Sequence, residues 1–151
     1  MAMTMTGEYQ IPAAQQVVWE KLNDPDVLKA CIPGCESLEK TSDTGFQAVA
    51  TIKIGPVKAK FKGNVTLSDL DPPNGYKISG QGEGGVAGFA KGGATVKLEP
   101  KDGGTLLTYN VEAQIGGKLA QLGQRLINGA AKKVADDFFQ NFVAAVSPKS
   151  S

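Results

Sequence analysis

The segment KLAQLGQRLINGAAKKVADDFFQNFVAAV, residues 118–146, decides the fold, because its pattern predicts a single long amphipathic helix. Apolar residues recur at every fourth position and are flanked by further apolar residues, while polar residues occupy the opposite face. The apolar stripe comprises Leu119, Leu122, Leu126, Ile127, Ala130, Ala131, Val134, Phe138, Phe142, Val143 and Val146. A helix of this length would extend about 43 Å, so it needs an equally extended surface to cover it.

The apolar stripe is graded along its length. Small residues lie in its middle and phenylalanines lie near its end: Gly123, Gly129, Ala130 and Ala131, then Phe138, Phe139 and Phe142. A glycine inside a helix costs about 1 kcal/mol relative to alanine, so two of them indicate close approach or retained space. The helix is therefore either simply a core helix or one that also roofs a cavity.

Six stretches upstream of this helix alternate between apolar and polar residues, as strands with one buried face do, and residues 36–41 form a further expected strand. The expected strands span residues 3–11, 36–41, 46–54, 57–67, 76–80, 94–98 and 107–115. Pro12 and the pair Asp24-Pro25 mark the starts of two short helices, which end near Leu22 and Ala30. Short turns join the later strands, so sequential strands are expected to pair antiparallel.

The predicted fold class is therefore α+β. A curved antiparallel sheet of about seven strands wraps around one long C-terminal helix, and two short helices follow the first strand. We expect one domain over residues 1–146 and a flexible tail over residues 147–151. Gly55, Gly63 and the segment 80–93 would allow the bends and bulges that such curvature needs.

Composition excludes several functional classes. The chain has 151 residues with 16 basic and 15 acidic side chains, a balance that argues against nucleic-acid binding. It contains no histidine, so catalytic triads and histidine-containing zinc sites are excluded. Neither a long apolar run nor a signal-peptide pattern is present, which predicts a cytoplasmic protein.

Three further stretches could carry chemistry. Cys31 and Cys35 are either packing residues or a pair that forms a reversible disulfide or a thiol-sensitive mouth, and they fit a reducing compartment. The glycine-rich segment 82–93 is followed by a strand, so it matches bent strands better than a phosphate-binding loop. A row of lysines, Lys58, Lys60 and Lys62, is either a solvated face or a docking patch for anionic lipid or an acidic protein.

Several motifs resemble those of the CoxG-like family of carbon monoxide dehydrogenase subunits, within the START and polyketide-cyclase-like (SRPBCC) superfamily. They are Met5-Thr6-Gly7-Glu8-Tyr9, Val18-Trp19, Asn23-Asp24-Pro25, Cys31-Ile32-Pro33-Gly34-Cys35-Glu36, Ile54-Gly55-Pro56-Val57, Phe61-Lys62-Gly63 and the segment 82–93. The resemblance implies a helix-grip fold with a hydrophobic tunnel between sheet and helix. It also implies an accessory role to a molybdenum-containing carbon monoxide dehydrogenase or related hydroxylase, which it would tether to the inner face of the membrane.

Our first hypothesis is a non-catalytic carrier of an isoprenoid quinone, such as menaquinone or ubiquinone, or of another lipid, with no metal or resident cofactor. The residues expected to contact this ligand are Trp19, Leu28, Ile32, Phe46, Phe61, Phe89, Tyr109, Leu119, Leu122, Leu126, Phe138 and Phe142. One alternative is a docking adaptor with a filled interior, which would act through its lysine row. The other is a cyclase-like enzyme, for which Glu83 and Tyr109 are the candidate acid or base.

Overall fold

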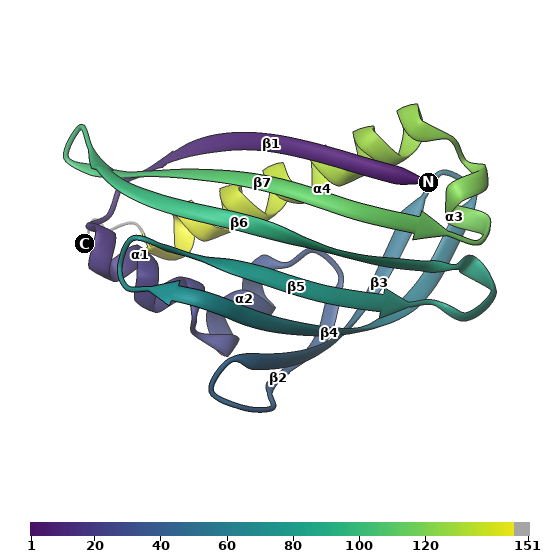
Figure 1. Cartoon of the computed structure of the whole chain (residues 1–151), viewed down its shortest axis with the longest axis horizontal. Helices are drawn as coiled ribbons and strands as arrows, with labels where there is room; N and C mark the ends of the chain where they lie inside the picture. Colours follow the sequence, from purple (N-terminus) through teal and green to yellow (C-terminus); the bar gives the residue numbers. More distant parts are fainter. Residues whose placement is uncertain (147–151) are drawn as a thin grey trace.

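The computed structural model describes residues 1–146 and contains one seven-stranded antiparallel sheet in the order β1-β7-β6-β5-β4-β3-β2. Figure 1 shows the sheet curving around a long helix that crosses behind it. The elements are β1 (Ala2–Ile11), α1 (Gln15–Leu22), α2 (Pro25–Cys31), β2 (Cys35–Lys40), β3 (Gly45–Ile54), β4 (Val57–Asp71), β5 (Gly75–Glu83), η1 (Gly85–Ala87), β6 (Phe89–Lys101), β7 (Gly104–Gly116), α3 (Lys118–Gln121) and α4 (Gln124–Val146). The predicted α+β helix-grip architecture is confirmed, and the predicted tail, residues 147–151, lies outside the described residues.

The prediction of one helix over residues 118–146 is wrong at its N-terminal end. The segment breaks after the single turn of α3, and α4 begins at Gln124. Gly123 has a φ of +91°, which lies outside the helical region and ends the first helix. Glycine adopts this conformation readily, whereas residues with a side chain rarely do. None of the helices within residues 1–146 is both long and apolar enough to cross a bilayer.

The glycine-rich passage bends the sheet without breaking its register. β5 and β6 pair continuously from Gly75 opposite Lys97 to Glu83 opposite Phe89, so the bulges expected there are absent. At Gly92 two backbones approach closely, since a Cβ at this position would lie 2.1 Å from the carbonyl oxygen of Glu112. Only a residue without a side chain permits this approach of two backbones.

The buried residues divide into two clusters along the length of α4. One cluster lies between the sheet, α1, α2 and the C-terminal half of α4, and it includes Ile11, Val18, Leu107 and Phe142. The other lies around α3 and the start of α4 and includes Phe61, with Met3, Ala87, Ile115, Leu119 and Ile127. The first cluster is filled by aromatic and large aliphatic side chains, whereas the second borders free space.

Candidate ligand-binding cavity

A cavity of about 450 Å³ lies between the inner face of the sheet and α4. Its wall comes from β1, β3, β4, β5, β6, β7, α3, α4 and the loop after α2. The lining residues are Met3, Met5, Ile32, Pro33, Ile52, Ile54, Phe61, Gly82, Ala90, Ile115, Leu119, Ile127, Ala130, Ala131, Val134, Ala135 and Phe138. The expected space between sheet and helix is therefore present.

Small residues facing one another create this space. Gly82 and Ala90 lie on the sheet side, and Ala130, Ala131 and Ala135 lie on the helix side. Together they leave a gap because a close-packed interior needs side chains to fill the distance between layers. The graded apolar stripe of the sequence thus separates an open half from a filled half.

Aromatic rings fill the other half of the interior. The Tyr9 and Phe139 rings stack with centroids 4.3 Å apart, and Tyr109 stacks on Phe139 at 5.8 Å. The ring centroids of Phe138 and Phe142 are 5.9 Å apart, and Phe142 is completely buried. This aromatic block closes the cavity at its inner end, where Phe138 belongs to both.

The cavity is open to solvent. Val134 lies seven residues after Ile127, about two helical turns, so both side chains point the same way. Ile127 is 4% exposed, whereas Val134 is 42% exposed. Because both line the same cavity, this difference indicates that solvent reaches its wall beneath α4 at Val134.

Hydrogen bonds hold α4 to the edge of the sheet and to α2. The Tyr9 hydroxyl donates to the Asp136 carboxylate, and the Gln124 amide donates to the carbonyl oxygen of Ala2 at 3.1 Å, which ties the helix to β1. The Asn141 amide donates to the carbonyl oxygen of Cys31 at 3.0 Å and ties it to α2. Near the turn between β3 and β4 the side chain of Leu126 lies over Gly55.

The lining contains no ionisable side chain and no side-chain hydrogen-bond donor. A ligand held there would gain free energy from burial of apolar surface, roughly 25 cal/mol for each Å². Such a wall can bind and orient an apolar molecule, but it supplies no acid or base to a reaction.

Polar groups at Asp136 help to hold α4 in place. The hydrogen bond from Tyr9 lowers the pKa of Asp136, and a second bond from Lys132 at 3.0 Å acts in the same direction. Burial and the bond to Asp136 raise the pKa of Tyr9 above its usual range. Tyr9 therefore remains neutral and serves as a hydrogen-bond donor to the helix.

Both thiols are free and flank the cavity loop. Burial raises the pKa of Cys31 and of Cys35, so neither is an activated thiolate. Ile32 and Pro33, which lie between them, line the cavity. Within residues 1–146 no group of three acidic or cysteine side chains could hold a metal ion.

The structure brings together four of the twelve residues expected to contact a ligand. Ile32, Phe61, Leu119 and Phe138 line the cavity. Five others, Trp19, Leu28, Phe46, Tyr109 and Phe142, pack in the aromatic cluster at the other end. Leu122 packs against the cluster around α3, and Phe89 and Leu126 are 43% and 40% exposed.

The residues missing from the sequence hypothesis are mainly aliphatic or small. Met3, Ile52 and Ile54 were predictable from strand alternation, because they share a face with Phe46 and Met5. Most of the large aromatic residues expected to contact the ligand fill the core, whereas aliphatic and small residues surround the void. Of the two candidate catalytic groups, Glu83 is exposed and pairs in register with Lys62, and Tyr109 is stacked against Phe139.

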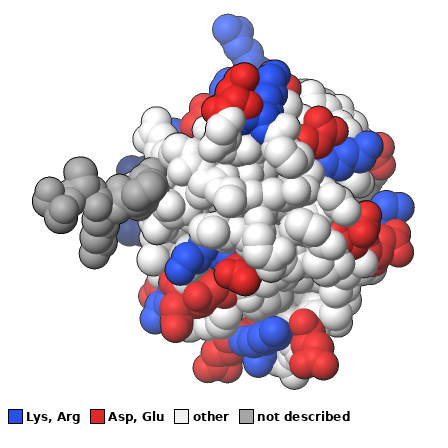
Figure 2. Space-filling view, turned by 90° about the vertical axis from the view of Figure 1, so that its left-hand side faces the viewer, with Lys and Arg blue, Asp and Glu red and all other residues white. Residues whose placement is uncertain are grey.

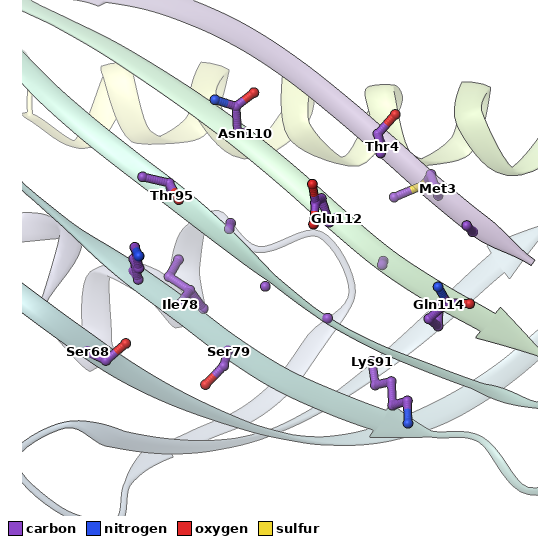
Figure 3. A pocket seen from close by; sticks show the side chains of 16 residues that line it. Met3, Thr4, Ser68, Ile78, Ser79, Lys91, Thr95, Asn110, Glu112 and Gln114 are labelled. Atoms are coloured by element: carbon purple, nitrogen blue, oxygen red, sulfur yellow. The ribbon is translucent and has the colours of Figure 1, made fainter.

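A second hollow lies on the outer face of the sheet and has a different character. Its volume is about 630 Å³, and Figure 3 shows its wall, with Thr4, Ser79, Asn110 and Glu112 among the side chains. At its centre Gly93 pairs with Ser79 on one side and Glu112 on the other, so a missing side chain produces the depression. These are the outward-facing polar residues of a sheet with one solvated face.

Comparisons with known proteins agree with this architecture. The family profile of CoxG, described as a subunit of carbon monoxide dehydrogenase, matches residues 7–147. A crystal structure of a conserved protein from Geobacillus kaustophilus is 36% identical with a TM-score of 0.90, and the match covers 95% of each chain.

More distant structures share the fold alone. Ara h 8.0201 is 17% identical with a TM-score of 0.67, over 97% of this chain and 98% of that one. The di-domain ARO/CYC BexL from the BE-7585A biosynthetic pathway is 10% identical with a TM-score of 0.69, over 98% of this chain and 51% of that one. No curated protein sequence matches the chain. The profile match over nearly the whole chain shows that this protein belongs to the CoxG family of carbon monoxide dehydrogenase subunits.

Proposed function

We propose that this protein is a non-catalytic accessory protein that holds an isoprenoid quinone, such as menaquinone or ubiquinone, or a similar lipid in the cavity beneath α4. In this role it recruits a carbon monoxide dehydrogenase or related molybdenum hydroxylase to the inner face of the membrane and links that enzyme to the quinone pool. Family membership supports the choice of partner.

The observation that carries the proposal is the apolar cavity of about 450 Å³. Pockets for small molecules typically measure about 300–1,000 Å³, so the space suits a ring with a short isoprenoid segment. Burial of one isoprenoid unit, about 100 Å² of apolar surface, contributes roughly 2.5 kcal/mol. Several buried units would hold a quinone without any charged contact, while the rest of a long chain could leave through the opening at Val134.

The same wall supports a carrier over an enzyme. A cyclase needs an acid or base that reaches the substrate, and the lining residues between Met3 and Phe138 offer none. The interior of a pure adaptor would be filled, so larger side chains would be expected where this protein has alanines and a glycine on both sides of a void. Bound ligand in the purified protein would therefore be expected of a carrier and not of an adaptor.

The decisive experiment is mass spectrometry of an organic extract from freshly purified protein. We expect a quinone or lipid at close to one molecule per chain in the wild type. Ala131→Phe places a ring in the cavity and should abolish this signal. Asn128→Phe adds the same ring on the exposed face of α4 and should leave it unchanged. Extracts that are empty in all three proteins would contradict the carrier function.

A further inference from the structure

One end of the molecule combines exposed apolar side chains with unpaired positive charge. We call it the η1 end and define it by Lys53, Lys58, Val86, Phe89, Lys118, Arg125 and Leu126. In Figure 1 it is the right-hand end, where the β5–β6 loop and α3 lie. We propose that the η1 end is a docking surface for an anionic lipid bilayer.

Tertiary contacts join these residues into one surface. Leu126 lies over Gly55 in the turn between β3 and β4, which Lys53 and Lys58 flank as a cross-strand pair. At the β7–α3 junction, Gly88 lies directly against Gly116 and Gly117, and this contact places η1 beside α3. The loops therefore form a continuous end face.

The apolar part of this surface protrudes. Val86 is 83% exposed, the largest value among the large apolar residues of the described chain, and it occupies a single turn between Gly85 and Gly88. Phe89 and Leu126 are 43% and 40% exposed. Side chains at loop tips can enter the headgroup region of a bilayer, where their removal from water is favourable.

The charged part of the surface is basic and lacks ion-pair partners. The four salt bridges found within residues 1–146 involve Lys60, Lys77, Lys132 and Lys133, and none involves Lys53, Lys58, Lys118 or Arg125. Glu83 is the acidic residue beside η1. Figure 2 shows the opposite end of the molecule, where acidic and basic side chains are interspersed. An anionic surface would therefore attract one end of the protein in preference to the other.

The cavity lies directly beneath this surface. Three of its lining residues, Ile54, Leu119 and Ile127, are next in sequence to Gly55, Lys118 and Leu126. Docking through the η1 end would bring this end of the cavity close to the bilayer, which shortens the path of an apolar ligand between the two. This inference rests on the proposed function and deepens it, because it names the surface that meets the membrane.

The test is co-sedimentation of the full 151-residue chain with phosphatidylcholine vesicles that contain or lack phosphatidylglycerol. We expect binding to the anionic vesicles only, weakening as salt is added. Lys53→Glu and Lys58→Glu should each lower the partition coefficient about fivefold or more. Val86→Asp should lower it about tenfold.

Matched controls lie at the opposite end. Leu70 is 42% exposed and Val17 is 37% exposed, so Leu70→Asp and Val17→Asp add the same charge to exposed apolar sites. Lys97→Glu and Lys101→Glu are the corresponding controls for charge. These four variants should bind as the wild type does, since they lie away from the proposed surface.

Equal binding to neutral and anionic vesicles would overturn the inference, and so would equal losses of binding in the control variants. It would also be overturned if the Lys53→Glu, Lys58→Glu or Val86→Asp protein bound vesicles normally but no longer retained the hydroxylase in a pull-down. The last result would identify a protein interface instead. Ala131→Phe keeps the η1 end intact and should still bind vesicles, so failure of ligand binding and failure of docking can be told apart.

Discussion

At the scale of single residues, the tie between Tyr9 and Asp136 fixes α4 against the edge of the sheet. Tyr9 lies on the inner face of β1, and its hydroxyl reaches across to the helix. Asp136 also accepts a hydrogen bond from Lys132 one turn earlier. An ionised carboxylate therefore contributes to holding the helix against β1.

This dependence predicts a change of stability with pH. The pKa of Asp136 is lower in the folded protein than in the unfolded chain, where it is about 3.9. Its contribution to the free energy of unfolding is therefore present above the unfolded pKa and is lost as pH falls through the folded pKa. Tyr9→Phe should be less stable than the wild type near pH 7, and the difference should shrink in strongly acidic solution. Urea unfolding of both proteins across the acidic range measures this difference in the free energy of unfolding.

Asparagine does not ionise. In the Asp136→Asn protein, the effect of Tyr9→Phe on the free energy of unfolding should therefore be the same at every pH in the acidic range. Asp137→Asn is the matched control, because Asp137 pairs with Lys133, whereas Tyr9 donates to Asp136. A Tyr9→Phe protein whose deficit persists unchanged at low pH would show that the Tyr9 hydroxyl stabilises the fold through a contact other than the ionised carboxylate.

At the scale of elements, the break between α3 and α4 shapes the η1 end. Gly123 has a φ of +91°, and a Cβ added to it would have no atom within 4 Å, so backbone conformation alone restricts this site. Gly129 lies inside α4, and a Cβ added there would also meet open space. The two glycines look alike in sequence but have opposite roles in the structure.

The prediction is that alanine has opposite effects at these two sites. Gly123→Ala should destabilise the protein by about 1–2 kcal/mol, because alanine disfavours the left-handed conformation. Gly129→Ala should stabilise it by about 0.5–1 kcal/mol through the reduced entropy of the unfolded chain. Thermal and urea unfolding measure both. Equal effects would mean that α3 and α4 can merge into one helix.

At the scale of the whole molecule, the cavity is the space left when two layers with small residues face each other. Its size is set by the curvature of the sheet and by the side chains that point inward. Gly92 and Gly82 both belong to the inner face but contribute differently. A Cβ on Gly92 would meet the Glu112 carbonyl oxygen at 2.1 Å, whereas on Gly82 it would make ordinary contacts at 3.7 and 3.9 Å.

We therefore expect Gly82→Val to fill space and Gly92→Ala to damage the fold. Gly82→Val should weaken ligand retention while keeping or raising the free energy of unfolding, since it adds apolar contacts in a void. Gly92→Ala should lower that free energy by about 1–3 kcal/mol through backbone displacement. Ligand in the extract and urea unfolding are the two measurements.

The neighbouring Gln81→Val provides the control for Gly82→Val, because Gln81 lies on the same strand and faces outward. It should leave ligand retention unchanged. If Gly82→Val retained as much ligand as Gln81→Val, the ligand would have to lie elsewhere.

The sequence by itself determined the seven strands, the two short helices and the long C-terminal helix, because periodicity of two or of about three and a half residues is a local property. It also indicated a void, through small residues at the centre of the stripe. Only the tertiary structure decided that Gly123 breaks the helix while Gly129 does not. It likewise decided that Trp19, Phe46 and Tyr109 fill the core while Met3, Ile52 and Ala131 surround the cavity. The reason is physical: a cavity is a difference between the volume enclosed by distant elements and the volume of the side chains inside it, and no single stretch of chain contains both quantities.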